Sequence, residues 1–362
     1  MPPPDALARA IRQLAGGQSL STDDTAEAFG AIMRGEASPA QVAAILVALR
    51  VKGETIDEVA GGARALRDAM VRLSSDGPDS LVDTCGTGGG AVTTFNISTA
   101  AALVAAGAGV RIAKHGNRSF TSQCGSADVL EALGVRIECT VDEMEHALRE
   151  AGIVFMFAPL MHPAMRHVGP VRRELAIHTM MNILGPLANP AGAGRQVVGV
   201  ADPQRLPLLA GALAALGSRR AMVVHGEPGM DEVSPLGPTR VLEVTNGRVR
   251  EWTIDPATLG LGATDARELG GADPAANART IEGVLTGRIR GAARAAVVLN
   301  AAAAIHVSGD GEDFEGSVRR AEEAVERGEG YGALERLRSV TGQGPGANDP
   351  GPRAKGQGPR GR

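Results

Sequence analysis

The chain has 362 residues, which is enough for two domains or for one large domain with an insertion. Its 37 basic and 41 acidic residues give a formal net charge of −4, without the basic excess that nucleic-acid binding requires. One Trp, one Tyr and six Phe also offer few aromatic platforms for stacking single-stranded bases.

The three cysteines, Cys85, Cys124 and Cys139, are odd in number and have no CxxC spacing. This argues against a disulfide framework and a zinc site, and is typical of a reducing cytosol. No apolar run reaches the ~18 residues of a membrane span, and the N-terminal MPPPDALARA lacks a signal-peptide core. We therefore expect a soluble cytoplasmic protein with no nucleic-acid or membrane partner.

Residues 5–72 are predicted to be entirely helical. Three helix starts, at Ser21, Ser38 and Thr55, each place a hydroxyl at the N-cap and an acid or amide three residues later. Behind Ser38 and Thr55 the apolar residues recur at helical spacing, which gives each helix one apolar stripe. Such a small helical unit needs a partner surface.

From Leu81 onward, short apolar runs alternate with helical stretches, which predicts a parallel sheet with crossover helices. The predicted strands are 81–85, 110–113, 135–137, 153–157, 197–200 and 221–225, with helices near 98–108, 126–133, 141–151, 203–216, 275–286, 291–307 and 315–329. Asn246-Gly247, between the apolar runs 241–244 and 249–254, predicts a hairpin at the edge of a mixed sheet.

The predicted fold class is therefore α/β, with a small all-helical N-terminal domain and a larger α/β domain whose mostly parallel central sheet is flanked by helices. Residues 1–72 and an inserted helical segment at about 163–184 form the small domain, and residues 73–162 and 185–340 form the large one. Gly185-Pro186 and Asn189-Pro190 after the inserted segment suit a hinge. The Gly/Pro-rich tail, 341–362, is predicted to be disordered.

A glycine-rich stretch, Gly86-Thr87-Gly88-Gly89-Gly90, follows the first predicted strand, and the polar cluster 96–99 begins the next helix. Glycines let consecutive backbone N–H groups approach one anion, and a helix N-terminus favours phosphate. A tight strand-to-helix turn without a ligand is the alternative. The hydroxyl-rich helix start favours a phosphate site.

Two further loops follow predicted strands, Lys114–Ser119 with its two cations and imidazole, and a turn with Asp231 and Glu232. Because the carboxyl ends of parallel strands share one edge, both loops can face the glycine stretch. Paired carboxylates beside phosphate oxygens suit Mg²⁺. Each loop alone could be a solvated surface feature, but their common edge favours a site.

The pair Arg172-Arg173 in VGPVRREL can be read in two ways. One arginine of such a pair usually faces solvent while the other pairs with an acid on the helix. Alternatively, Arg172 reaches a planar carboxylate, which its forked donors match. The spacing does not decide between them, and the nearby His162 and His167 are more often structural than catalytic.

The chain carries, in order, the motifs DTCGTGG, NIST, KHGNRS, GSADVLEALG, FAPLMHPAMRHVGPVRREL, NILGPLANP and HGEPGMDEVSP. Through these motifs it closely resembles the anthranilate phosphoribosyltransferase family, from about residue 7 to residue 340. The resemblance implies a homodimer that transfers phosphoribose from 5-phosphoribosyl 1-diphosphate (PRPP) to the amino nitrogen of anthranilate. It also implies Mg²⁺ as cofactor, with two ions per subunit.

The resemblance implies three groups of substrate- and metal-binding residues. Those for PRPP are Gly86, Gly89, Gly90, Thr94, Asn96, Ile97, Ser98, Thr99, Lys114, His115, Gly116, Asn117, Arg118, Ser119, Phe120, Thr121, Ser122 and Ser126. Those for anthranilate are Gly86, Asn117 and Arg172, and the metal ligands are Ser98, Asp231 and Glu232.

We expect Lys114 and His115 to be the catalytic residues. The aromatic amine already carries a lone pair, so electrostatic stabilisation rather than a strong general base is needed. One position departs from the family pattern, because the glycine stretch usually ends in Asp where this chain has Gly90. A side-chain contact near the diphosphate is therefore absent or supplied elsewhere.

Two other functions share this scaffold. A pyrimidine nucleoside phosphorylase binds inorganic phosphate, so it has less need of the Asp231-Glu232 pair, and its second loop differs from KHGN. A non-enzymatic nucleic-acid-binding relative would carry a basic stripe, which the net charge of −4 argues against.

Overall fold

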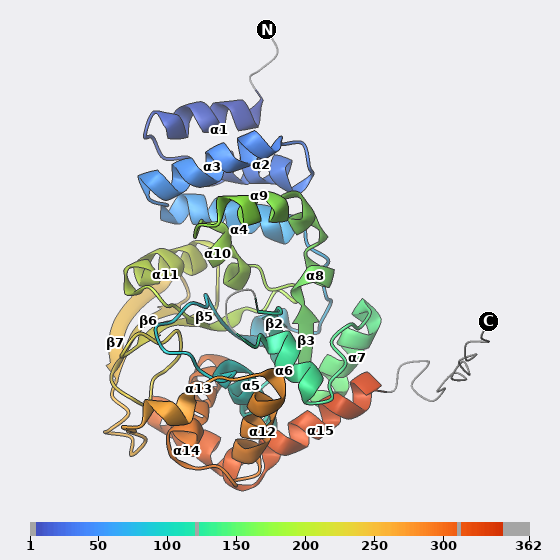
Figure 1. Cartoon of the computed structure of the whole chain (residues 1–362), viewed down its shortest axis with the longest axis vertical. Coiled ribbons are helices and arrows are strands. Elements are labelled where there is room, and N and C mark those ends of the chain that lie inside the picture. The colour runs from blue at the N-terminus through green and yellow to red at the C-terminus, as the bar shows by residue number, and fades with distance from the viewer. Residues whose placement is uncertain (1–4, 120–122, 310–312, 343–362) are drawn as a thin grey trace, which may run out of the picture.

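The structure, a computed structural model, describes residues 5–119, 123–309 and 313–342. Its N-terminal helices are α1 (Ala6–Ala15), α2 (Thr22–Met33), α3 (Pro39–Lys52) and α4 (Ile56–Asp68) (Figure 1). The predicted caps are present: Ser21 Oγ accepts from the backbone of Asp24, and reciprocal capping boxes begin α3 at Ser38 and α4 at Thr55. The predicted small helical domain is confirmed.

The large domain is built on a seven-stranded sheet in the order β3-β2-β1-β4-β5-β6-β7. The strands are β1 (Val82–Gly86), β2 (Ile112–Gly116), β3 (Ile153–Phe157), β4 (Arg195–Gly199), β5 (Arg220–Gly226), β6 (Thr239–Thr245) and β7 (Arg248–Ile254). β1 to β5 run parallel, whereas β6 and β7 are antiparallel and form the predicted hairpin. Asn246 and Gly247 in its turn have φ values of 49° and 78°. The predicted α/β fold class is confirmed.

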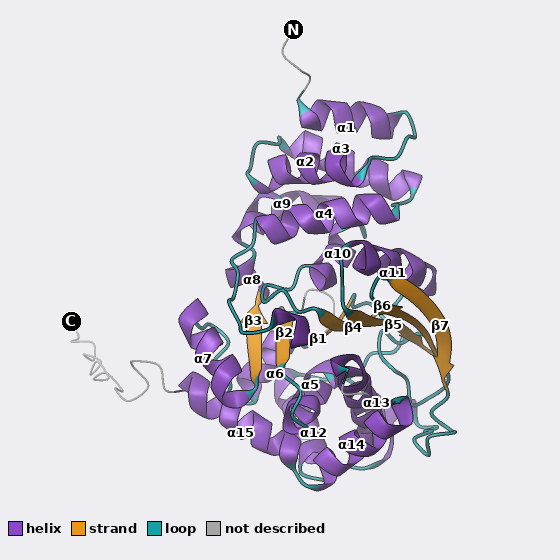
Figure 2. Ribbon diagram, turned by 180° about the vertical axis from the view of Figure 1, so that it is seen from behind, coloured by secondary structure: helices purple, strands orange, loops and turns teal. Residues whose placement is uncertain are grey.

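Helices cover both faces of this sheet (Figure 2). One face packs against α5 (Ile97–Gly107) and α13 (Gly291–Ser308), and the other against α11 (Leu206–Ala215). Neighbouring strand residues accordingly join different cores: Val197 belongs to the cluster around α5 and α13, and Val198 to the cluster shared with the helical domain. The remaining helices of the large domain are α6 (Ser126–Ala132), α7 (Val141–Ala151), α12 (Pro274–Leu285), α14 (Phe314–Glu326) and α15 (Glu329–Gly342).

Between β3 and β4 the chain runs along the helical bundle and returns. This segment contains α8 (Ala158–Met161), α9 (Gly169–Leu175), α10 (Met181–Leu184) and the 3₁₀ turns Pro163–His167 and Gly185–Leu187. α9 contacts α3, α10 contacts α4, and α4 packs on α11. Arg67 of α4 donates from Nε to the carbonyl of Leu187 at 2.7 Å, which ties the bundle to the returning chain. Three further 3₁₀ turns are Pro78–Ser80, Pro203–Arg205 and Ala266–Leu269.

α13 is long and apolar enough, by length and composition, to cross a membrane. However, 83% of this 18-residue helix is buried inside the protein, as in the core helix of a globular domain. Its alanine-rich sequence allows it to pack closely against α5, which is equally rich in alanine.

Two predictions about secondary structure are wrong. Residues 135–137 form no strand; Val135 and Ile137 are buried in the core as extended chain without a ladder partner. The predicted helix 315–329 ends at Glu326, and a separate helix, α15, begins at Glu329. Gly328 lies between them with φ 67°, a left-handed conformation that interrupts the helix.

The far edge of the sheet is fixed by a buried acid, Glu243 of β6, which is 4% exposed. Its carboxylate accepts hydrogen bonds from Arg220 Nε at 2.9 Å, Arg250 Nη2 at 3.1 Å and Trp252 Nε1 at 3.0 Å. Trp252 also packs edge-on against Phe314, with 5.5 Å between the ring centroids. The cluster therefore joins β5, β6, β7 and α14.

Candidate active site

The strand order changes direction at β1, which lies between β2 and β4. In α/β sheets, ligands bind beyond the carboxyl ends of the strands at such a switch point. The glycine stretch begins at the last residue of β1, and the Asp231-Glu232 turn follows β5. Lys114, His115 and Gly116, predicted to lie in a loop, are the last residues of β2, because this strand runs three residues beyond the predicted end at 113. The topology thus brings the three predicted loops to one edge of the sheet.

The glycine stretch packs directly against Asp231. The backbone N–H of Gly88 donates to Asp231 Oδ2 at 2.9 Å, and Gly88 and Gly89 have φ values of 70° and 82°. A Cβ at Gly86 would lie 2.8 Å from the same oxygen, closer than carbon and oxygen normally approach. A Cβ at Gly90 would lie 3.0 Å from Asp231 Oδ1. Glycine at position 86 is thus required by the close approach of the carboxylate.

The polar cluster 96–99 lies at the start of α5, and its side chains have different partners. The amide of Asn96 donates to the carbonyl of Cys124 at 3.1 Å and accepts from Asn277 Nδ2 at 3.1 Å. The hydroxyl of Ser98 lies 3.3 Å from the ammonium of Lys114. The side chains of Ile97 and Thr99 are buried in the core, and their backbone N–H groups donate to the carbonyls of Phe95 at 2.7 Å and of Asn96 at 3.1 Å. The backbone of Thr94 forms an isolated bridge with Gly270.

Lys114 is 3% exposed and directed beneath the glycine stretch. Its ammonium donates to the carbonyl of Thr84 and lies 3.3 Å from the Thr84 hydroxyl. Burial lowers the pKa of Lys114, while the nearby carboxylate of Asp83 opposes that shift. A cation in this position stabilises negative charge at the edge of the sheet.

His115 stacks at a tilt against His162, with 4.9 Å between ring centroids and 54° between the planes. Burial and the neighbouring imidazole of His162 lower the pKa of His115 to about 3, and burial lowers the pKa of His162 to about 4. Among the described residues neither ring nitrogen of His162 has a hydrogen-bond partner. Both rings are therefore neutral at pH 7. No motif in the sequence indicates this pairing, because His162 comes from the chain after β3.

The rest of the second loop is held by its own helix. Arg118 pairs with Asp128 at 3.0 Å and with Glu131 at 2.5 Å, both in α6. Asn117 Oδ1 accepts from the backbone of Arg118 at 2.8 Å. The backbone of Ser119 donates to Asp128 at 3.2 Å, and the hydroxyl of Ser126 donates to the carbonyl of Asn117 at 3.4 Å. The predicted ligands Phe120, Thr121 and Ser122 lie outside the described residues.

Asp231 and Glu232 are neighbours whose charges repel. Burial, followed for Glu232 by the charge of Asp231, raises the pKa of each carboxyl group above its usual range. A cation would relieve this repulsion, and with the Ser98 hydroxyl the two carboxylates form the oxygen donor set that Mg²⁺ prefers. No cluster of three or more His, Cys, Asp or Glu occurs in the described ranges, so such a site depends on substrate or solvent oxygens for its other ligands.

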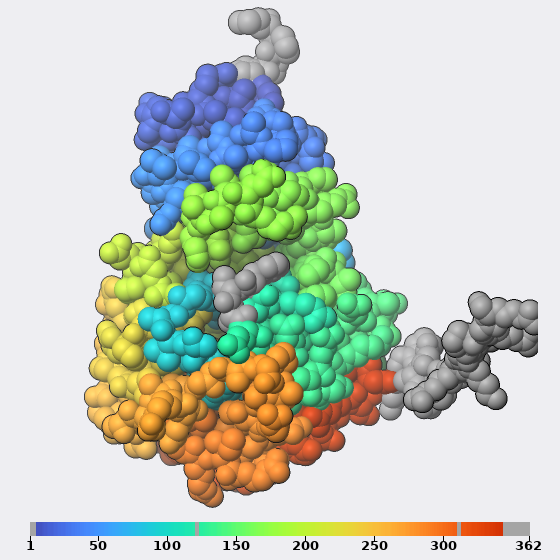
Figure 3. Space-filling model, in the orientation of Figure 1, coloured from blue at the N-terminus to red at the C-terminus, as the bar shows by residue number. Residues whose placement is uncertain are grey.

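Arg172 extends from α9 and is partly buried, whereas Arg173 is exposed. Within the described part of the chain its guanidinium makes no hydrogen bond or ion pair, and burial lowers its pKa. An arginine in this state is available to a carboxylate ligand. Figure 3 shows α9, in light green, across a cleft from the glycine stretch, in cyan.

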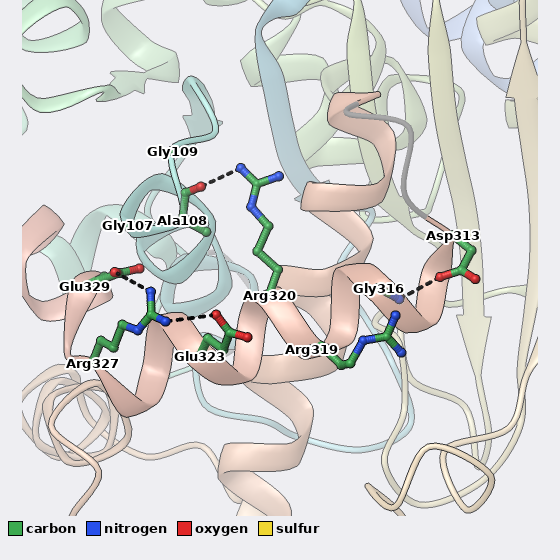
Figure 4. A pocket seen from close by; sticks show the side chains of 10 residues that line it. All are labelled: Gly107, Ala108, Gly109, Asp313, Gly316, Arg319, Arg320, Glu323, Arg327 and Glu329. Atoms are coloured by element: carbon green, nitrogen blue, oxygen red, sulfur yellow. Dashed lines mark hydrogen bonds and ion pairs between the residues drawn. The ribbon is translucent and has the colours of Figure 1, made fainter.

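A hollow of about 780 Å³ elsewhere in the molecule does not belong to this site (Figure 4). It lies between the C-terminal end of α5 and α14, and two of its three arginines are held by neighbouring groups, whereas Arg319 has no hydrogen bond or ion pair among the described residues. Arg320 donates to the carbonyl of Ala108 at 2.6 Å, and Arg327 pairs with Glu323 at 3.2 Å and with Glu329 at 3.8 Å.

Comparison with known proteins agrees with this geometry. Residues 8–70 match the model of the glycosyl transferase family helical bundle domain, and residues 78–331 match that of its a/b domain. An anthranilate phosphoribosyltransferase from Rubrobacter xylanophilus is 51% identical over 335 residues, covering 92% of this chain and 97% of its relative. The chain belongs to the anthranilate phosphoribosyltransferase family. The family resemblance inferred from the motifs is thereby confirmed.

Solved structures of family members have the same fold. The anthranilate phosphoribosyltransferase of Thermus thermophilus is 43% identical with a TM-score of 0.87, covering 93% of this chain and 99% of its own. The Saccharomyces cerevisiae enzyme in complex with PRPP and Mg is 27% identical with a TM-score of 0.84, covering 94% and 98%. The yeast enzyme has also been solved with 4-fluoroanthranilate, at 26% identity and a TM-score of 0.82, covering 92% and 97%.

Proposed function

We propose that this enzyme transfers the 5-phosphoribosyl group of PRPP to the amino nitrogen of anthranilate, giving N-(5-phosphoribosyl)anthranilate and diphosphate in tryptophan biosynthesis. The observation that carries the proposal is the meeting of a glycine stretch, a buried lysine and a carboxylate pair at one switch point of the sheet. Membership of the family supports it.

The diphosphate and ribose phosphate of PRPP are proposed to bind across the first two loops. The backbone N–H groups of Gly86, Gly89 and Gly90 supply donors to phosphate oxygens. Other contacts come from Thr94, Asn96, Ser98, Thr99, Asn117, Ser119 and Ser126, and from the backbone of Ile97, Gly116 and Arg118. Asp231 and Glu232, with Ser98, are proposed to hold Mg²⁺, as the raised pKa values of the two carboxyl groups support.

Anthranilate is proposed to lie between the glycine stretch and α9. Its carboxylate matches the forked donors of Arg172, whose guanidinium has no internal partner in the described residues. The Asn117 amide and the Gly86 backbone complete the contacts. This arrangement aims the amino nitrogen toward the sugar, and such positioning converts a bimolecular encounter into an oriented one.

In the reaction the bond from the anomeric carbon to nitrogen forms, the bond from that carbon to diphosphate breaks, and the nitrogen gives up one proton to the departing diphosphate or to solvent. Positive charge develops on the sugar and negative charge on the leaving oxygen. The ammonium of Lys114 stabilises the latter charge. Bound Mg²⁺ supplies Lewis-acid stabilisation of the diphosphate.

In this reaction the neutral ring of His115 lines the acceptor site and does not act as an acid. Its pKa of about 3 excludes an imidazolium at neutral pH. The amine needs no strong base because its lone pair is already free, so a neutral ring that excludes water and orients the acceptor is sufficient.

Domain boundaries, assembly and location are also proposed. The inserted segment contacts α3 and α4, which supports its assignment to the helical domain with residues 1–72. We propose a cytoplasmic homodimer that takes up only these small substrates, with two Mg²⁺ ions per subunit.

The proposal is tested by mixing the purified chain with anthranilate, PRPP and Mg²⁺ and following the loss of anthranilate fluorescence. We expect loss only when all three are present, with release of diphosphate in equal amount. Fluorescence that stays constant, while the protein is folded, would contradict the proposed function.

A further inference from the structure

The sheet is interrupted between β1 and β2. β1 pairs with β4 along all five of its residues, from Val82 to Gly86. With β2 it pairs at a single position, Val82 with Ile112. Beyond that pair the two strands have no ladder, although their carboxyl ends carry the glycine stretch and the Lys114–Ser119 loop. Something other than backbone pairing must hold these two loops at a fixed spacing.

Two buried side chains bridge this gap. Asn189 Nδ2 donates both to Asp83 Oδ2 of β1 and to the carbonyl of Ala113 of β2, each at 2.8 Å. The other carboxylate oxygen, Asp83 Oδ1, accepts from the backbone N–H of His115 at 3.2 Å. The pair therefore replaces the missing ladder with hydrogen bonds between side chains and the β2 backbone.

Both side chains are sealed from solvent, with Asp83 0% and Asn189 4% exposed. Asn189 Oδ1 accepts from the backbone of Ala191 at 2.9 Å, which fixes the orientation of the amide. Each oxygen of Asp83 thus faces one of these N–H donors. Buried groups matched in this way tolerate little displacement, since a lost partner leaves a donor or acceptor unsatisfied.

Asn189 also lies where the chain returns from the helical domain, just after the Gly185–Leu187 turn that α4 contacts through Arg67. The amide that spans the β1–β2 gap is therefore part of the segment that connects the domain carrying Arg172 to the sheet.

From these contacts we infer that Asp83 and Asn189 are a positioning pair, which sets the spacing of the two PRPP-binding loops and couples it to the orientation of the helical domain. The inference rests on the proposed function, because it assigns a purpose to the spacing. Neither residue touches the reacting atoms; both act through the loops that β1 and β2 carry.

The first variant is Asp83→Asn, which keeps the size of the side chain. Its amide has one acceptor where the carboxylate offers two, and two donors face it. The new NH₂ group then faces the N–H donor of either His115 or Asn189, and the two donors repel. We expect this repulsion to widen the gap between β1 and β2. We expect the Kd for PRPP with Mg²⁺ and the KM for PRPP to rise at least about tenfold, with a fall in kcat.

The exchange Asp83→Asn with Asn189→Asp is the rescue. Asn at position 83 can again accept from His115 and donate to Asp at position 189, which can still accept from Ala191. The bond to Ala113 is lost, and the carbonyl of Ala113 then faces a carboxylate oxygen in place of an N–H donor. We expect the double variant to recover part of the PRPP affinity that Asp83→Asn loses. Asn189→Ala removes the same bridge but keeps the Asp83 carboxylate and its charge near Lys114, and should raise both constants as Asp83→Asn does.

Gln196→Met is the matched control. Gln196 is 1% exposed and its amide donates to the carbonyl of Pro186 at 2.7 Å, so it holds the same returning segment from β4 without bridging β1 and β2. A purely structural role for the pair predicts lower melting temperatures for all variants but parental Kd and KM in each folded protein. Binding stoichiometry from calorimetry normalises every constant to folded sites.

A rise in Kd and KM that is confined to Asp83→Asn and Asn189→Ala, and reversed by the exchange, supports the inference. Parental constants in those variants would overturn it, as would an equal rise in Gln196→Met or failure of every bridge variant to fold. A folded but inactive parent chain contradicts the proposed function instead, so the two failures are distinguishable.

Discussion

The buried imidazole pair gives the protein a specific sensitivity to acid. His162 is 5% exposed, its ring contacts that of His115, and burial lowers its pKa from 6.5 to about 4. In the unfolded chain the same group takes up a proton near pH 6.5. Between these two pKa values the unfolded state binds more protons, so the free energy of unfolding falls as the pH falls.

The size of this effect follows from the two pKa values. Between pH 7.5 and pH 5.5, one group that titrates near 6.5 when unfolded and near 4 when folded removes about 1.3 kcal/mol of stability. The variant His162→Gln cannot titrate. We therefore expect its free energy of unfolding to decline less than that of the parent over this interval, by about 1.3 kcal/mol.

Urea denaturation at the two pH values measures the difference. The comparison uses the change with pH, so that any constant cost of replacing the ring cancels. The matched control is His146→Gln, which removes an exposed imidazole from α7 and leaves the buried pair intact. If His162→Gln and the parent decline equally, the ring titrates at its ordinary pKa in the folded protein and the reasoning from burial is refuted.

Three predictions concern the proposed ligands. Arg172→Ala should raise the KM for anthranilate about ten- to a hundredfold and leave the KM for PRPP nearly unchanged, as steady-state kinetics can measure; an unchanged acceptor KM excludes the assigned contact. Replacing Asp231 and Glu232 with Asn and Gln should abolish Mg²⁺-dependent turnover and raise the metal-free melting temperature, because two repelling carboxylates are removed. Retained turnover, or a melting temperature that still responds to Mg²⁺, contradicts the metal role. Gly90→Asp should destabilise the metal-free protein by about 1–3 kcal/mol, since its Cβ would lie 3.0 Å from Asp231 Oδ1; calorimetry that shows no loss would mean that the loop yields at no cost.

The features that sequence predicts correctly here are local ones. Ser38 and Gln41 satisfy each other's backbone within one helical turn, and Asn246-Gly247 occupies a two-residue hairpin turn that few other pairs can adopt. The meeting of three loops was also predictable, because parallel strands bring their carboxyl ends together whatever their exact order.

Features that depend on distant partners were not predictable. The apolar run at Val135 and Ile137 has the composition of a strand, but it pairs with none of the described strands, although β3 lies at an edge of the sheet. Asp83 and Asn189 are 106 positions apart, and nothing in either local sequence indicates that the amide fills a gap in the sheet. Arg118, predicted to bind PRPP, pairs with Glu131 of α6, thirteen positions further along the chain, and neither local sequence indicates this contact.

The position of the sole tryptophan makes its fluorescence a signal separate from that of the substrate anthranilate. Trp252 lies on β7, with β4, β5 and β6 between it and β1, and its indole N–H is held by Glu243. Its emission therefore follows the opening of the hairpin edge and of α14, and not events at the far side of the sheet. Anthranilate, itself fluorescent, would report on the cleft beside α9. Unfolding and substrate consumption can thus be recorded in one cuvette as independent signals.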